Sequence, residues 1–122
     1  MTDEQIFAFL RTHIRSVWAL ELLLFLARDR DRGWHASELV REMRSSSVAV
    51  TEALRNLQGA GLTALDGDNR YRYSPASPEV DALARGVEQA YAARPSAVVK
   101  AIVTAPDDKL RIFADAFKLK DR

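Results

Sequence analysis

The histidines of this chain are the first residues to test for acid–base or metal-binding chemistry, because histidine is the commonest metal ligand and general base. The chain has two, His13 and His35, and no cysteine. They fall in different predicted elements, and no HExxH spacing supplies further ligands. We interpret His13 as a helix-face residue and His35 as a residue at a helix start. The sequence therefore predicts no metal site and no cofactor.

A serine run, Ser45–Ser47, could supply a nucleophile, but no histidine lies near it in the sequence. Helix capping accounts for these hydroxyls, because a serine before a helix accepts from unpaired amides of the first turn. The chain also has no GxSxG elbow, no GxxxxGK[ST] loop and no GxGxxG after a strand. We therefore expect a protein that is not an enzyme.

Glu21 is the acidic residue within an otherwise apolar stretch, 17–27. One hypothesis makes it a buried acid used for sensing or proton transfer. The alternative is a carboxylate at the rim of the core or one paired with an arginine, and this is the interpretation we favour, because glutamate is rarely buried without a partner.

The segment 34–62 has the pattern of a helix-turn-helix. Leu39, Val40 and Met43 indicate one short amphipathic helix, and the serine run then breaks the pattern. A second helix follows, with Ser45 or Ser46 as its N-cap, Gly61 as a left-handed stop, and inward positions at Val50, Ala53, Leu54 and Leu57. Two short helices joined in this way cross steeply, and the second keeps a free face.

A β-hairpin is predicted directly after the second helix. Leu62–Leu65 is a short strand, Asp66–Asn69 is a turn of residues that tolerate positive φ, and Arg70–Tyr73 is a second strand. Residues from about 17 to 73 resemble the winged helix-turn-helix domain of bacterial transcription regulators of the MarR type. The resemblance rests on the SELVREM and SVAVTEALRNL helices, the Gly61-Leu62 corner and the DGDNRYRY wing. In this comparison Trp34 supplies the small strand that the wing joins.

The resemblance implies a regulator that binds double-stranded DNA. Base reading would fall to the free face of the second helix, and phosphate or minor-groove contacts to arginines. The candidate DNA-binding residues are Ser46, Ser47, Thr51, Glu52, Arg41, Arg44, Arg55, Arg70 and Arg72. Glu52 departs from the pattern, because many relatives carry a basic residue there.

The charge balance keeps a second function open. DNA-binding domains usually carry a basic excess, whereas the formal net charge here is +1. The alternative is a winged-helix module, an adaptor or regulator, that binds protein and does not read DNA. A DNA binder needs its arginines on one face, while an adaptor needs an exposed apolar patch.

Additional helices flank this domain. Thr2 and Gln5 resemble a capping box before an N-terminal helix, and Ser16 can cap the helix that begins at Val17. Helices are also predicted from Pro78, from Pro95 and from about Asp108. The predicted fold is mainly α with a small β-hairpin: a winged helix-turn-helix with N- and C-terminal helices. We divide it into an N-terminal helix and winged domain, 1–74, and a C-terminal helical extension, 75–122, in one compact unit.

The last helix is the predicted dimer or partner surface. Leu110, Phe113 and Phe117 share one side of it, and either pack on Ile6 and Phe9 as core or form that surface. The resemblance implies a homodimer, and the alternative function implies a protein partner bound by the C-terminal helices. The longest apolar run, 17–27, is about half the ~20 residues of a membrane span, so we expect a cytoplasmic protein that does not enter membranes.

Overall fold

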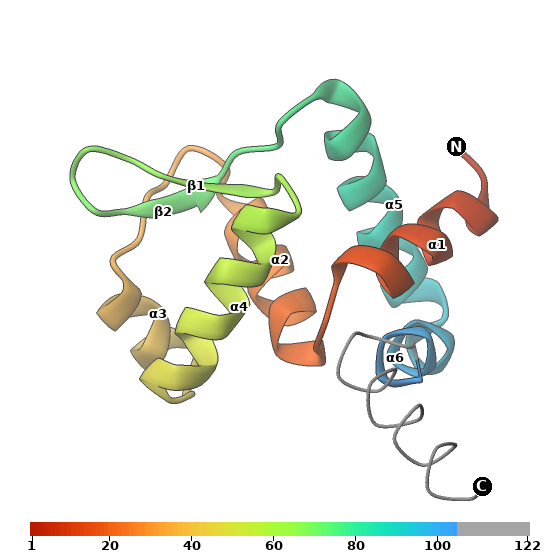
Figure 1. The fold of residues 1–122 in the computed structure, drawn as a ribbon, viewed down its shortest axis with the longest axis horizontal. Helices are drawn as coiled ribbons and strands as arrows, with labels where there is room; N and C mark the ends of the chain where they lie inside the picture. The colour runs from red at the N-terminus through yellow and green to blue at the C-terminus, as the bar shows by residue number, and fades with distance from the viewer. Residues whose placement is uncertain (105–122) are drawn as a thin grey trace, which may run out of the picture.

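The computed structural model describes residues 1–104 of the 122-residue chain. Over this range the fold is mainly α, with a small antiparallel hairpin between the fourth and fifth helices (Figure 1). This confirms the predicted fold class. The elements are α1 (Asp3–His13), α2 (Val17–Arg28), α3 (Ala36–Met43), α4 (Ser47–Gly59), β1 (Thr63–Leu65), β2 (Tyr71–Tyr73), α5 (Pro78–Ala93) and α6 (Pro95–Val103). Leu110, Phe113, Phe117 and the helix predicted from Asp108 lie outside the described residues.

Helix α2 lies at the centre of the domain, as its apolar sequence predicts. The Ser16 hydroxyl caps it by accepting from the Ala19 amide at 3.0 Å. All of its leucines are buried, and it packs against α4, α6 and β2. Trp18 is the exception that the sequence did not indicate, because 45% of its surface is exposed.

The predicted helix-turn-helix is formed by α3 and α4, which pack on each other. Arg44 ends α3 in the left-handed region (φ 51°), and Ser46 caps α4 by accepting from the Ala49 amide at 3.1 Å. The predicted inward positions of α4 are confirmed, because all of them are buried: Val50, Ala53, Leu54 and Leu57. In Figure 1 helix α4 crosses in front of α2, and its opposite side is free.

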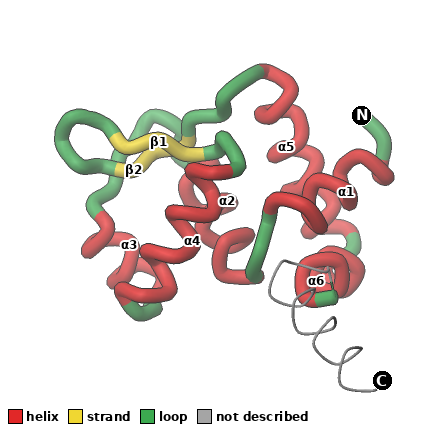
Figure 2. The backbone as a smooth tube through the Cα atoms, viewed as in Figure 1, coloured by secondary structure: helices red, strands yellow, loops and turns green. Residues whose placement is uncertain are grey.

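The hairpin is attached to the segment that precedes α3. Strands β1 and β2 pair antiparallel with Thr63 opposite Tyr73, and Figure 2 shows them in yellow joined by their turn. Gly61, at φ 75°, occupies the predicted left-handed position before β1. Trp34 bridges to Tyr71 through two backbone hydrogen bonds of 2.8 and 2.7 Å. Trp34 therefore supplies the predicted additional strand segment, an arrangement compatible with a winged helix.

The N-terminal helix packs against the helices that follow the hairpin. Helix α1 contacts α5 and α6, which also contact each other, and these helices lie together on the right of Figure 1. The Thr2–Gln5 capping box is present as predicted. Helices α1 and α5 approach each other so closely at Gly86 of α5 that an added Cβ would lie 2.5 Å from Ile6 Cδ1 of α1.

Among residues 1–104, no helix is both long enough and apolar enough to cross a lipid bilayer.

Candidate functional site

The outer side of α4 is an accessible surface of the α3–α4 pair. Ser47, Thr51, Glu52 and Arg55 are all exposed there, opposite the buried face. The structure therefore brings these predicted residues together on one helix. Ser46 differs from them, because its hydroxyl oxygen caps the helix.

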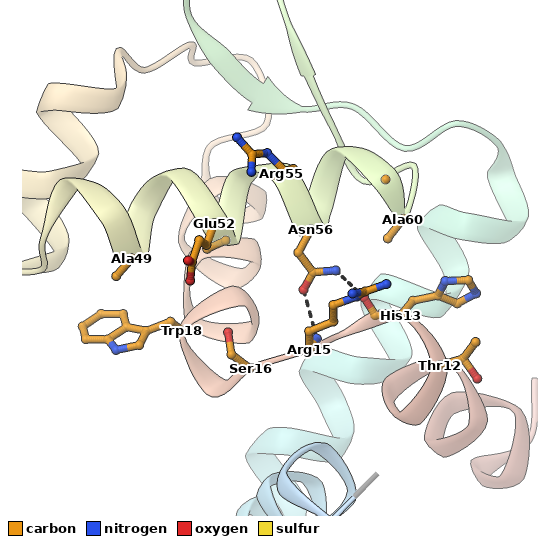
Figure 3. Close-up of a pocket in the computed structure, with 12 residues that line it drawn as sticks. Thr12, His13, Arg15, Ser16, Trp18, Ala49, Glu52, Arg55, Asn56 and Ala60 are labelled. Atoms are coloured by element: carbon orange, nitrogen blue, oxygen red, sulfur yellow. Dashed lines mark hydrogen bonds between the residues drawn. The ribbon is translucent and has the colours of Figure 1, made fainter. Parts of the chain in front are cut away.

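A groove of about 710 Å³ runs along one flank of this surface (Figure 3). One wall is α4, with Ala49, Glu52 and Asn56. The other wall is the corner between α1 and α2, which carries Arg15 and Trp18. Figure 3 shows the Trp18 ring extending from α2 below Ala49 of α4, with Glu52 above the start of the Trp18 side chain.

Asn56 joins the two walls. Its Oδ1 accepts from the Arg15 amide at 2.9 Å, and its Nδ2 donates to the His13 carbonyl at 2.6 Å. Both partners are backbone groups that would otherwise be left unpaired between two helices. The groove is therefore fixed in shape by a side chain of α4. Sequence reasoning missed both Asn56 and Trp18, and no local pattern around them indicates these roles.

Three predicted phosphate-binding arginines are available for an outside partner. Arg41, Arg44 and Arg55 are exposed, and none of them forms an ion pair with a residue of the range 1–104. Arg41 and Arg44 lie at the end of α3, and Arg55 lies on the outer side of α4.

The wing arginines are used differently from each other. The tyrosines of β2 turn toward the core, since Tyr73 is buried and Tyr71 is half-buried. Arg70 and Arg72 share the other face, where a Cβ added at Gly33 would lie 2.8 Å from Arg70 Cβ and 2.9 Å from Arg72 Nη2. Arg70 is exposed, with its Nε 3.5 Å from His35 Nε2.

The guanidinium group of Arg72 is bound by other residues of the fold. It donates to Asp66 Oδ2 at 2.8 Å and to the Asp31 carbonyl at 2.9 Å. The pKa of Asp66 is lowered mainly by the hydrogen bond from Arg72. A hydrogen bond from the backbone amide of Arg70 lowers it further. Of the two predicted wing contacts, Arg70 is thus the one that is free to meet a partner.

A second polar cluster ties the wing to the helix that follows it. The Tyr73 hydroxyl donates to Asp81 Oδ1 at 2.7 Å, and Asp81 also pairs with Arg30 and, at 3.2 Å, with Arg85. Burial and the bond to Asp81 raise the pKa of Tyr73 to about 12, and the same bond is the main cause of the lowered pKa of Asp81. Arg30 therefore serves the fold and is not part of a free basic face.

Glu21 lies at the rim of the core, one of the two positions we favoured for it, and its partner is a tyrosine and not an arginine. It is half-buried on α2 and accepts a hydrogen bond of 2.7 Å from the Tyr91 hydroxyl of α5. This bond raises the pKa of Tyr91. The pairing gives Glu21 a structural explanation, since it joins the central helix to α5.

The histidines lie apart in the structure. His13 is exposed at the end of α1, where its ring lies 5.1 Å from that of Phe9. His35 precedes α3, and its Nδ1 lies 3.2 Å from the Asn69 carbonyl. Within the part of the chain that the structure describes, no group of three or more His, Cys, Asp or Glu residues could hold a metal ion.

Comparison of the chain with protein-family models, with curated proteins and with solved structures gives no match.

Proposed function

We propose that this protein is a transcription regulator that binds double-stranded DNA through a winged helix-turn-helix, as the resemblance to MarR-type regulators implies. The observation that carries the proposal is the pairing of Trp34 with Tyr71. This pairing places the hairpin beside the segment that opens α3, while the outer side of α4 stays free. A helix with a free face next to a wing is the geometry with which this class enters the major groove.

In this proposal α4 reads bases and arginines position the protein. The hydroxyl of Thr51 can bond several base edges, and Glu52 can accept from cytosine N4. Ser47 lies at the entry to the same face. Exposed arginines hold phosphates, which fixes the register without reading sequence; these are Arg41, Arg44, Arg55 and Arg70.

The regulator acts as a homodimer in this proposal, because two-fold symmetric proteins match the symmetry of palindromic operators. Sedimentation at micromolar concentration tests this. A strict monomer would contradict the dimer and would weaken the operator hypothesis, because a nearly neutral single domain makes few phosphate contacts.

The alternative is a protein-binding module, and the exposed apolar side chains favour it. Val48 on α4 is 65% exposed, and Trp18 and Leu65 are each 45% exposed. A protein partner that covered any of these side chains would remove apolar surface from water. The net charge of +1 agrees with this alternative. It predicts that Phe113→Asp, or Val48→Asp, removes a protein partner in a pull-down.

Selection from a random duplex library separates the two functions. The regulator proposal predicts that the wild-type protein enriches a defined sequence, and that Thr51→Ala or Glu52→Ala changes the preferred sequence. If the wild-type protein enriches nothing and its weak binding is lost at physiological salt, the DNA proposal is wrong.

A further inference from the structure

The groove between α4 and the α1–α2 corner lies beside the helix that we propose to bind DNA. We infer that this groove holds the sugar-phosphate backbone of one strand of the duplex, with Arg15 on a phosphate and the ring of Trp18 against the adjoining sugar. This inference rests on the proposed function.

The position of the groove fits such a strand. A helix in the major groove lies between the two backbones of the duplex, so its flanks meet phosphates while its tip meets bases. In Figure 3 the hairpin lies above α4 and the α1–α2 corner lies below it. The wing therefore serves one flank of α4, and the corner serves the other.

Trp18 is an aromatic side chain of the groove that is partly exposed to solvent. It belongs to a helix whose other large apolar side chains are buried or half-buried, yet it is 45% exposed and lines the groove. Water is a poor environment for an indole ring, and covering it is favourable. The face of a sugar offers apolar C–H groups to the ring, and the indole N–H can donate to a phosphate oxygen.

The charges of the groove favour an anion over a cation. Arg15 and Arg55 line it, against Glu52 as the acidic lining residue of the described range. Neither arginine forms an ion pair with another described residue. Glu52 lies on α4, where the base edges would be, whereas Arg15 lies on the opposite wall, where the backbone would be.

The corner is also held firmly enough to position a contact. The two hydrogen bonds of Asn56 fasten the Arg15 amide and the His13 carbonyl to α4. Arg15 therefore moves with the reading helix, and a phosphate bound there fixes how α4 enters the major groove.

Binding of duplexes by Arg15→Ala and Trp18→Ala tests the inference, with Lys100→Ala as the matched loss of one exposed positive charge on α6. The probes are a duplex selected by the wild-type protein and a duplex of unrelated sequence. We expect each groove variant to bind both probes about 5- to 20-fold more weakly, because a backbone contact is independent of sequence. Arg15→Ala should reduce the slope of log K against log salt by about 0.9, and Lys100→Ala should bind like the wild type.

Tryptophan fluorescence gives a second readout. Trp34 is 7% exposed, so quenching on addition of duplex should come from Trp18 and should disappear in Trp18→Phe. Trp18→Phe keeps an aromatic ring, so it tests the site even if Trp18→Ala folds poorly.

The outcomes separate this inference from the proposed function. If the wild type binds a selected duplex but Arg15→Ala and Trp18→Ala bind it equally well, the groove inference is overturned and the DNA proposal stands. If Trp18→Ala instead abolishes self-association and leaves DNA binding unchanged, the groove is a protein interface, which also overturns it. If the wild type binds no duplex, both proposals fail.

Discussion

Asn56 of α4 holds Arg15 in place from a distance of 41 residues along the chain, through a hydrogen bond of 2.9 Å between its Oδ1 and the Arg15 amide. The same side chain donates to the His13 carbonyl at 2.6 Å. The side-chain amide of Asn56 thus pairs with one backbone donor and one backbone acceptor of the α1–α2 corner. Neither backbone group has a partner within α1 or α2.

Removal of this amide should loosen the corner. We expect Asn56→Ala to lower the free energy of unfolding by about 1–3 kcal/mol, because two backbone groups lose their partners. Urea denaturation measures this, with Gln58→Ala at an exposed position of α4 as a control that should change stability by less than about 0.5 kcal/mol. Equal stability of the two variants would mean that water replaces the amide without cost.

Leu54 tests the orientation of α4. It is 2% exposed at the contact of α4 with the core, so Leu54→Ala should destabilise the protein by about 2–5 kcal/mol. Val48→Ala, at a position that is 65% exposed, is the matched control on the same helix. Thermal melting distinguishes them, and an unchanged melting temperature for Leu54→Ala would contradict the assignment of the outer face.

The contact of α1 with α5 depends on the absence of a side chain at Gly86. Gly86→Ala should gain about 1 kcal/mol from helix propensity, but a Cβ there would lie 2.5 Å from Ile6 Cδ1 and 2.8 Å from Ile6 Cγ1. Overpacking costs about 1–3 kcal/mol, and Ile6 is buried, so we expect net destabilisation.

Removal of the Ile6 side chain tests whether its contact with a Cβ at position 86 causes the destabilisation. In an Ile6→Ala background both close atoms are gone, so Gly86→Ala should become stabilising, and the two substitutions should be strongly non-additive. A double-mutant cycle by urea denaturation measures the coupling. Additive effects would show that the helices separate without cost.

The link between the wing and α5 should depend on pH. The hydrogen bond from Tyr73, assisted by the charges of Arg30 and Arg85, lowers the pKa of Asp81 below its ordinary value of 3.8. The stability that ionised Asp81 contributes is therefore fully present above that value and is lost as the pH falls through the folded-state pKa. The difference in unfolding free energy between wild type and Asp81→Asn should therefore hold at higher pH and should narrow once the pH falls below 3.8. A constant difference would show that Asp81 acts as a neutral acceptor.

The two wing arginines should give opposite results. Arg70→Ala should leave the melting temperature unchanged. It should also reduce the slope of log K for DNA binding against log salt concentration by about 0.9, because one phosphate contact is lost. Arg72→Ala should lower the melting temperature, because Asp66 and the Asp31 carbonyl lose their partner. Arg72→Ala should change the slope of log K against log salt concentration only slightly. If both variants change only DNA binding, Arg72 leaves Asp66 when the duplex binds.

Local signals in the sequence determined the elements of this fold. Capping hydroxyls lie within three residues of the amides they bind, as at Thr2, Ser16 and Ser46. The inward positions of α4 follow from the 3.6-residue repeat of its apolar residues, and Trp34 was expected to join the wing. Such signals are readable because both partners lie close together in the chain, or because one periodicity fixes a whole face.

The tertiary structure decided which side chains are free to act. Arg70 and Arg72 have the same type and alternate along one strand, yet the fold brings Asp31 and Asp66 to Arg72 and leaves Arg70 exposed. The apolar sequence of α2 indicates a central helix but does not show that Trp18 is exposed, because a central helix is covered only where neighbouring elements reach it. Asn56 acts across 41 and 43 residues of sequence. Contacts at such separations depend on how helices cross, and the side-chain spacing within any one helix does not contain that information.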